Sequence, residues 1–549
     1  MLSFKNLKKK SVLPFLIHWL FWGSYFTLLW SRQIVVTDNG WIAGGASTWG
    51  DGAAHLTYMS AFAFRDKFPL QQPVFLGGRF SYPFVADLLG AMLVKLGLPL
   101  NVAYSLWGLA LSMLLVVMVF WLFKKWFEDA LVALVGSAVF FWSGGLGWWW
   151  FLKDVGNNGL IKILAALPRE YTHMEENSVF WINTISAEFL PQRAFLLGMS
   201  VGIGILLLLT RAREKRERRR KYLLIAGILT GLLPIIHPHS LIVITIVSLF
   251  WFFCDLFGKN RRRILDWWWF GIPAAGIGGI LLFAWVMPVI SESLIKWWPG
   301  WMSNPESHGE NFILFWIKNW GFFWILAIGG FIKLKKNKKK LIIPFIILWI
   351  FANLVLFQPW DWDNSKIFTW VYLGLSGAAG MFLVKMWQKK IGWMRVGLVF
   401  LFLGTTLAGM LDSIRLLDYN QVSLQLFDNE GVLLAEQVKR HTNPEAIFLT
   451  GDQHNHWVPA LTGRQILMGY QGWLWSYGFD YTQRDKDVRA MFQGNLAGKM
   501  LIDKYEVDYV VIGDYEKERF KVNSEWFEDN YNIAFESDNY LVYRIKNQE

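Results

Sequence analysis

Asp51 and His55 stand four residues apart in the stretch STWGDGAAHLTY, just after the first long apolar segment of the chain. The following residues, AAHLTYMSAFAF, predict a short helix at the membrane interface, with both side chains on one face, a turn apart. A carboxylate placed there could act as a general base. It could also simply cap the helix, a common role of aspartate.

Further side chains suited to binding a charged or hydroxylated substrate gather in four other stretches. Residues 79–82 lie in the same loop as Asp51, and the others read NTISAEFLPQRAF (183–195), HPHS (237–240) and QPWDWDNSKIF (358–368). Arginine and lysine can neutralise a phosphate at a developing charge. The candidate binding residues are His55, Arg79, Tyr82, Glu188, Arg193, His237, His239, Asp361, Asp363 and Lys366.

Each stretch also has an ordinary structural explanation. Glu188 and Arg193 could pair with each other, HPHS could be a polar turn, and the tryptophans beside Asp361 are typical of an interfacial belt. HPHS could supply two zinc ligands, but no third ligand stands at a recognisable spacing. The sequence therefore predicts no metal site.

Long apolar segments separate these stretches in a chain that is 54% hydrophobic. A transmembrane helix needs about 20 apolar residues to cross a hydrocarbon layer of roughly 30 Å. The pattern predicts a polytopic α-helical membrane protein with about 11–13 transmembrane helices. The candidate spans are 13–31, 84–98, 101–123, 129–152, 187–210, 222–236, 239–257, 267–289, 313–332, 341–357, 367–386 and 393–411.

Basic residues set the expected orientation, because lysine and arginine stay on the cytoplasmic side. Clusters such as FKNLKKK, RAREKRERRRK and KLKKNKKK fall between spans and place the N-terminus inside and the residues after 412 outside. The number of crossings is then odd: eleven if 84–98 does not cross, or thirteen if 129–152 breaks at SGGLG into two crossings. All the polar stretches come to lie on the outer side, which predicts a cavity at the outer membrane surface.

The charge and cysteine content exclude two classes of protein. The net charge of +12 comes from these short clusters rather than from a basic stripe on a soluble domain, so nucleic acid is not an expected partner. The single cysteine, Cys254, excludes an internal disulfide and a cysteine-based metal site.

The composition changes after about residue 418. EAIFLT (445–450) and DYVVIG (508–513) predict buried strands, and VLLAEQVKR (432–440) and AGKMLIDKY (497–505) predict helices. We therefore expect a membrane domain over 1–411, with a first outer loop at 32–83, and an extracytoplasmic α/β domain over 412–549. Residues 451–464 and 469–481 mix aromatic and hydrogen-bonding groups, as sugar binding and docking on a membrane interface both require.

One span, an outer loop with an early Asp, many further spans and an outer C-terminal domain together resemble the GT-C membrane glycosyltransferases. The early acid is Asp51 in WGDGAAHL, and QPWDWDNSKIF and FLPQRAFLLG look similar to segments of uncharacterised prokaryotic members. The paired acids of many members are absent, because Gly52 follows Asp51, and WSYGFDY is only a loose echo of the oligosaccharyltransferase motif WWDYG. Transfer of a single sugar is therefore the expected activity, rather than transfer of an oligosaccharide to asparagine.

The resemblance implies an inverting glycosyltransferase that takes a sugar from a polyprenyl-phosphate donor to a hydroxyl of a glycan, lipid or protein. It implies Asp51 as the base, the other candidates as substrate-binding residues, and no required cofactor, with a divalent cation possible. It also implies a multi-pass protein of the plasma (inner) membrane, in contact with membrane lipids.

Two other classes of function stay open. A transporter or flippase for a lipid-linked saccharide would carry paired acids and bases deep within its spans and internal repeats, and the sequence contains neither. A non-enzymatic glycan-binding membrane protein would tolerate the loss of Asp51.

Overall fold

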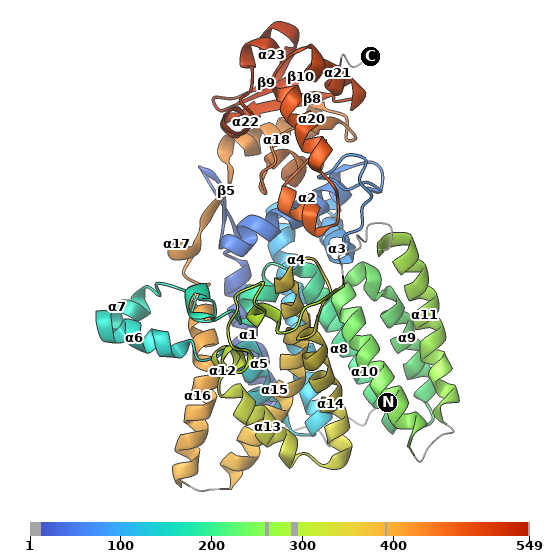
Figure 1. Ribbon diagram of the computed structural model, residues 1–549, viewed down its shortest axis with the longest axis vertical. Coiled ribbons are helices and arrows are strands. Elements are labelled where there is room, and N and C mark those ends of the chain that lie inside the picture. The colour runs from blue at the N-terminus through green and yellow to red at the C-terminus, as the bar shows by residue number, and fades with distance from the viewer. Residues whose placement is uncertain (1–11, 259–262, 287–294, 390–391, 547–549) are drawn as a thin grey trace. The chain divides into compact units, whose positions relative to one another are not determined.

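The computed structural model describes residues 12–258, 263–286, 295–389 and 392–546. Contacts divide the chain into two compact units (Figure 1). Unit 1 comprises Met1–Leu29, Leu109–Leu282 and Glu292–Gln421, and unit 2 comprises Trp30–Gly108, Phe283–Ser291 and Val422–Glu549. Unit 2 thus combines the first loop with the C-terminal segment, although nearly all of the membrane domain separates them in the sequence. The predicted domain boundary at residue 412 stays a prediction.

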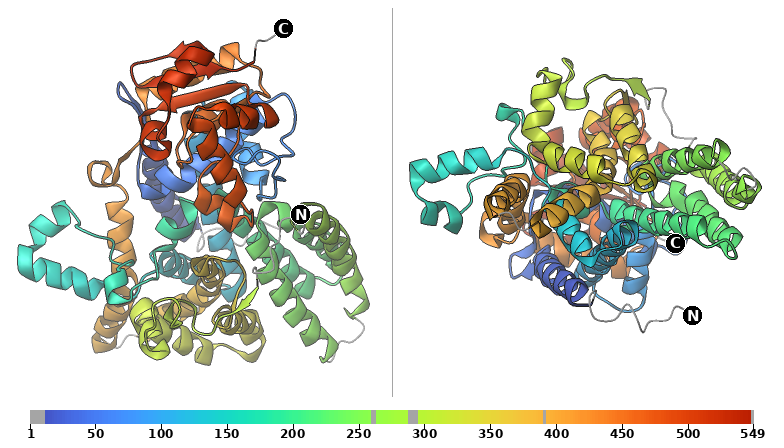
Figure 2. Two further views of the ribbon diagram at one scale, coloured as in Figure 1. Left: turned by 45° about the horizontal axis from the view of Figure 1, so that its top comes forward. Right: turned by 90° about the horizontal axis from the view of Figure 1, so that it is seen from below.

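Unit 1 is helical, and its apolar composition explains why, since every backbone polar group of a helix is paired internally. Most of α1 and most of α4 also belong to unit 1. In Figures 1 and 2, α8, α9, α10 and α11 lie side by side; α8, α9 and α10 contact one another, and α11 packs on α9. The helices are α1 (Val12–Trp30), α4 (Leu100–Phe127), α5 (Ala130–Phe141), α6 (Trp148–Asn158), α7 (Leu160–Ala165), α8 (Arg193–Glu214), α9 (Arg219–Ile236), α10 (Pro238–Leu256), α11 (Trp268–Leu281), α12 (Phe312–Trp320), α13 (Phe323–Lys333), α14 (Lys336–Ala352), α15 (Ser365–Gln388) and α16 (Gly392–Arg415).

Among the described residues, seven helices are long and apolar enough to cross a membrane, or eight if α12 and α13, which meet at an 88° bend, form one span. The prediction of a polytopic α-helical membrane protein is confirmed. The seven segments are Val12–Trp30, Leu100–Phe127, Arg193–Glu214, Pro238–Leu256, Leu265–Val286, Asp361–Gln388 and Gly392–Arg415.

The count of eleven or thirteen crossings depended on 84–98 and 129–152, and neither segment contains a helix long enough to cross a membrane. Residues 84–98 contain only α3 (Val85–Lys95), whose 11 residues extend roughly 16 Å at 1.5 Å per residue, about half of a hydrocarbon layer. Residues 129–152 are broken between α5 and α6, as the Gly-rich SGGLG stretch suggested. Asn183 stabilises this break, because its side-chain amide donates to the carbonyl oxygen of Phe141 (2.9 Å), at the end of α5, and to that of Ser143 (3.0 Å) in the break itself.

Unit 2 contains an α/β arrangement built on a five-stranded sheet of order β7-β6-β8-β10-β9. β6 runs parallel to β7 and β8, whereas β10 is antiparallel to β8 and β9. The strands are β6 (Ile447–Leu449), β7 (Gln465–Ile466), β8 (Tyr509–Gly513), β9 (Asn532–Glu536) and β10 (Tyr540–Arg544). The predicted strands at 445–450 and 508–513 are confirmed as β6 and β8, and the predicted helices as α18 (Asn429–His441) and α21 (Leu496–Lys504).

A second sheet joins the first loop to the C-terminal segment. β1 (Ile34–Thr37) and β2 (Gly40–Ala43) form a hairpin, and β2 pairs antiparallel with β5 (Leu424–Asp428). Residues just before Asp51 are therefore fixed by a strand that belongs to the C-terminal segment.

Candidate functional site

Asp51 lies in a π-helical turn, Thr48–Gly52, which continues directly into α2 (Ala53–Phe64). Such turns are rare in proteins, and those that occur often lie at functional sites. The N-cap positions are Ser47 for the turn and Gly52 for α2, so Asp51 lies within the turn rather than at either cap position. Thr48 anchors the start of the turn, because its hydroxyl donates to Gln33 Oε1 at 2.6 Å. Asp51 is half-buried.

His55 forms a buried pair with Asp87, a residue that the sequence analysis did not select. His55 Nδ1 lies 2.9 and 3.0 Å from the two carboxylate oxygens of Asp87, and the side chains are 2% and 0% exposed. A carboxylate accepts hydrogen bonds, so Nδ1 of His55 carries a proton and donates it to Asp87. Asp87 thereby fixes the orientation and tautomer of the imidazole. The signal was present in VADLLGAML, since an acid within an apolar segment often marks a functional site.

Three tyrosines surround this pair. Tyr58 stacks on Tyr82 with 4.6 Å between ring centroids, and Tyr58 donates its hydroxyl hydrogen bond to the Tyr477 hydroxyl at 3.1 Å. Burial raises the pKa of Tyr477 well above its ordinary value, and the nearby Tyr58, Tyr82 and Asp51 raise it further. Asp51, His55 and Tyr82 thus lie near one another in unit 2, beside Tyr477, whose phenol stays protonated. Arg79, by contrast, is exposed and donates to the carbonyl oxygen of Ala284.

The aromatic stretches of the C-terminal segment pack beside the Asp51 turn. The ring of His454 stacks on Tyr470 at 3.5 Å between centroids and lies 5.1 Å from Trp49, two residues before Asp51. Trp473, in α19 (Gln471–Ser476), meets the His454 ring edge-on at 5.5 Å. Burial lowers the pKa of His454, so the ring is neutral near pH 7.

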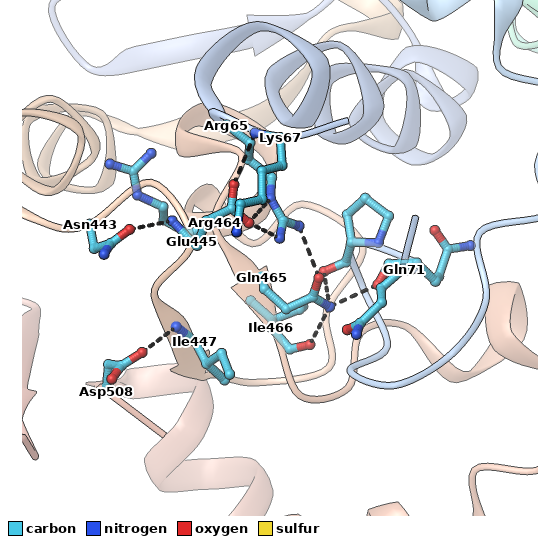
Figure 3. Close-up of polar contacts among 12 residues, drawn as sticks. Arg65, Lys67, Gln71, Asn443, Glu445, Ile447, Arg464, Gln465, Ile466 and Asp508 are labelled. Carbon is cyan, nitrogen blue, oxygen red and sulfur yellow. Dashed lines mark hydrogen bonds and ion pairs between the residues drawn. The ribbon is translucent and has the colours of Figure 1, made fainter. Parts of the chain in front are cut away.

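Polar contacts tie α2 and the loop after it to the C-terminal segment (Figure 3). Arg65, next after α2, donates from Nε to Glu445 Oε2 at 3.0 Å and from a second nitrogen to the same oxygen, and it also reaches Gln465 Oε1 at 3.0 Å. Ser60 donates to the carbonyl oxygen of Ala460 at 2.7 Å. The C-terminal segment of the chain therefore holds α2, the helix that carries His55, in place.

Residues 73–76 continue this attachment as an extra edge of the five-stranded sheet. Three backbone bonds link the two segments: Ile466 N to Pro73 O (3.1 Å), Gly469 N to Val74 O (2.7 Å) and Leu76 N to Leu467 O (3.2 Å). Gln465 adds two side-chain bonds, to the carbonyl oxygens of Gln72 (2.8 Å) and Pro73 (3.1 Å). β7 would otherwise be an exposed sheet edge, and the first loop covers it.

The remaining predicted residues belong to unit 1. Glu188 lies in a second π-helical turn, Ile185–Phe189, and accepts a hydrogen bond from Ser365 Oγ at 2.7 Å. Arg193 opens α8 and is fully buried. Lys366, at the start of α15, lies 3.0 Å from Asp363 Oδ1, and both charges act on His239.

His237 and His239 form the turn between α9 and α10. His237 Nδ1 accepts hydrogen bonds from Ser240 N (3.2 Å) and Ser240 Oγ (2.9 Å), so its proton sits on Nε2. The His239 ring lies 5.4 Å from it, and His239 Nε2 is buried without a hydrogen-bond partner among the described residues. Structure thus joins His237, His239, Asp363 and Lys366 in one cluster, buried except for the half-buried Asp363.

Asp361 has a different role from its neighbours. Its carboxylate accepts from Ser307 Oγ (2.6 Å) and from the backbone of Trp362 (2.8 Å), while its carbonyl oxygen accepts from Trp301 Nε1 (2.8 Å). These bonds fix the 301–307 loop. Its predicted role in substrate binding stays a prediction.

Among the described residues, no three His, Cys, Asp or Glu side chains lie close enough together to hold a metal ion. The prediction on cofactors stays a prediction.

Comparisons with known proteins agree with this architecture. Residues 184–372 match the model of a family of unknown function (DUF6541), a range that includes every predicted site residue of unit 1. No protein of curated function matches the sequence.

Three solved structures have a similar fold. The oligosaccharyltransferase of Archaeoglobus fulgidus is 12% identical, with a TM-score of 0.54 over 93% of this chain and 70% of that one. The arabinofuranosyltransferase AftD from Mycobacteria is 13% identical, with a TM-score of 0.54 over 97% of this chain and 42% of that one. ArnT from Cupriavidus metallidurans is 11% identical, with a TM-score of 0.52 over 95% of this chain and 97% of that one.

The chain has the GT-C fold. The expected resemblance in architecture is confirmed over nearly the whole length of the chain. The sequence identity of 11–12% establishes a common fold and no more than that. The Archaeoglobus protein, AglB, has also been solved with an inhibitory peptide and a dolichol-phosphate.

Proposed function

We propose that this GT-C chain is an inverting glycosyltransferase that moves a sugar from a polyprenyl-phosphate donor to a hydroxyl acceptor at the outer face of the plasma membrane. The observation that carries the proposal is the buried His55–Asp87 pair on the helix that follows the Asp51 turn. Burial of a carboxylate and an imidazole is costly, so such a pair is typical of a site that does chemistry.

In the proposed reaction, Asp51 takes the proton of the acceptor hydroxyl as that oxygen attacks the anomeric carbon. The new carbon–oxygen bond forms on the face opposite to the lipid phosphate, the bond to the phosphate oxygen breaks, and the configuration inverts. His55, held by Asp87, orients the sugar or the acceptor. The departing phosphate needs positive charge rather than a proton.

Arg193, Lys366 and Arg79 are the proposed sources of that charge. Burial favours the first two, because a cation shielded from water acts more strongly on a phosphate. His237, His239, Asp361 and Asp363 are proposed to contact the sugar. The complex of AglB with a dolichol-phosphate supports a lipid-linked donor in a protein of this fold. The acceptor class, glycan, lipid or protein, is proposed only as a hydroxyl compound.

The test compares the purified wild type with Asp51→Asn and with Asp38→Asn, the same change at an exposed residue of the β1–β2 turn. Each protein receives a panel of polyprenyl-phosphate sugars, with and without a crude glycan or protein acceptor, and release of polyprenyl phosphate is measured. Loss of the base should lower turnover by about 10²–10⁴-fold, whereas Asp38→Asn should match the wild type. Equal turnover by all three proteins would remove Asp51 from the mechanism.

A further inference from the structure

Helices α6 and α7 form an arm in the segment between α5 and α8 (Figure 1, teal). All views show the arm extending sideways from the other helices of unit 1 (Figures 1 and 2). Gly159, with a φ of 85°, joins the two helices. A left-handed conformation of this kind costs other residues free energy, and it lets the chain turn sharply without a longer loop.

One side of the arm belongs to the core. Phe151, Ile163 and Leu167 are buried against Tyr171 and against two residues of α16, Ala408 and Leu411. This small cluster attaches the arm firmly to the bundle, so its opposite side has a defined direction.

The opposite side is apolar and exposed. Trp149 and Leu152 are neighbours on α6 at a spacing of three residues, and α7 follows with three more apolar side chains. The exposed fractions are 51% for Trp149, 47% for Leu152, 51% for Leu160, 86% for Ile161 and 50% for Leu164. A surface of five large apolar side chains with no protein cover marks a site of interaction rather than contact with water.

The charges of the arm favour an anionic membrane surface as its partner. Residues 148–165, all of them described, contain two lysines and one acid. Asp154 is turned inward, where it accepts from the Tyr171 hydroxyl at 2.9 Å and pairs with Arg169. Lys153 is exposed beside the apolar side, with its ammonium 5.8 Å from the Trp149 ring, and Lys162 is exposed on α7.

The arm is also joined to a helix with an exposed apolar side, α16. α16 is a candidate membrane span and exposes Val396, Phe400 and Leu403 along one side. Leu407, one turn beyond Leu403, packs against the arm. The arm is therefore attached to α16 one turn beyond the exposed apolar side chains of that helix.

We propose that the α6–α7 arm lies in the interface of the membrane, with its apolar side among the upper parts of the acyl chains and Lys153 and Lys162 at the lipid phosphates. Tryptophan and lysine are the residues that prefer this depth, and amphipathic helices bind there by apolar burial together with attraction to anionic headgroups. Anchoring of this kind does not depend on glycosyl transfer.

The single cysteine of the chain allows a direct test in the full-length protein. In a Cys254→Ser background, Ile161→Cys is labelled with an environment-sensitive fluorophore, and the protein is placed in nanodiscs with lipids brominated near the top of the acyl chains. Asn157→Cys is the matched control, since Asn157 lies one turn after Lys153 on the polar edge of α6 and is exposed. Leu164→Cys provides a second reporter if Ile161→Cys fails to fold.

Burial of the arm by about 5–10 Å should give blue-shifted emission and several-fold stronger bromine quenching at position 161 or 164 than at position 157. Water-like emission with equal, weak quenching at all positions would overturn the proposal. Emission that shifts only when another protein is added would also overturn it and would assign the surface to a protein partner.

Discussion

The Arg65–Glu445 ion pair is the contact whose loss should most clearly loosen the first loop. Arg65 is 11% exposed and Glu445 28% exposed, so the pair is partly screened by water. Buried hydrogen bonds to charged groups contribute about 1.5–3 kcal/mol, whereas exposed ion pairs contribute about 0–1 kcal/mol. Glu445→Gln removes the charge but keeps an oxygen for the Lys67 amide, which donates to Glu445 at 3.3 Å. We expect a loss of about 1–2 kcal/mol in the attachment of the loop.

Hydrogen exchange measured by mass spectrometry reports this attachment directly. The amides of Leu76, Ile466 and Gly469 make the backbone bonds that hold residues 73–76 to the sheet, and they exchange when the loop lifts away. A loss of 1–2 kcal/mol corresponds to about 5–30-fold faster exchange. Peptides from α15, which is almost wholly buried in unit 1, should exchange as in the wild type.

Glu436→Gln is the matched control. Glu436 is 53% exposed on α18 and pairs with Lys439 at 2.6 Å, so its loss should change exchange little. If Glu445→Gln and Glu436→Gln gave the same exchange at Leu76, Ile466 and Gly469, the view of Arg65–Glu445 as the clamp of the loop would be refuted.

Three further predictions follow from single contacts. Asp87→Asn should lower sugar transfer by about 10–100-fold, because His55 loses the carboxylate that fixes its tautomer; release of polyprenyl phosphate equal to that of the wild type would contradict this. Gly463→Ala should lower the thermal midpoint, since Gly463 has a φ of 70° and an added Cβ would lie 2.4 Å from the Ser60 carbonyl oxygen, a backbone cost of about 1–2 kcal/mol before the clash, whereas Gly156→Ala, which meets no atom within 4 Å, should not lower it. Burial alone would raise the pKa of Glu516, but hydrogen bonds from His456 and the backbone hold it below the ordinary 4.5, so its contribution to stability is present above pH 4.5 and is lost as the pH falls through the lower folded value; Glu516→Gln should flatten this acid-induced fall of the thermal midpoint.

The sequence predicted elements whose signals are local. The helix AAHLTYMSAFAF is α2 residue for residue, and the apolar runs at 445–450 and 508–513 are strands. Basic clusters and long apolar segments predicted the membrane class because the physics of insertion acts on each segment separately.

Elements that depend on distant partners were not predicted. Residues 84–98 have the composition of a span, yet α3 is short, and it brings Asp87 to His55 across 32 positions of the chain. Residues 73–76 carry no strand pattern of their own, because their pairing is set by β7 and by the Gln465 side chain. Some of the predicted site residues belong to unit 1 and others to unit 2. The spacing of residues along the sequence does not show which unit each one joins.

The attachment of residues 72–76 to the C-terminal sheet also sets an order for biogenesis. Gln72 and Gln465, which share a hydrogen bond, are separated by 393 positions. At about 5–20 residues per second of synthesis, the ribosome adds the second partner roughly 20–80 s after the first. Throughout that interval the sheet edge to which residues 73–76 attach does not exist. The first loop must then stay soluble without its attachment to the C-terminal segment. The first loop therefore gains these contacts only after the C-terminal segment has been synthesised, and a chain that stops before residue 465 lacks them.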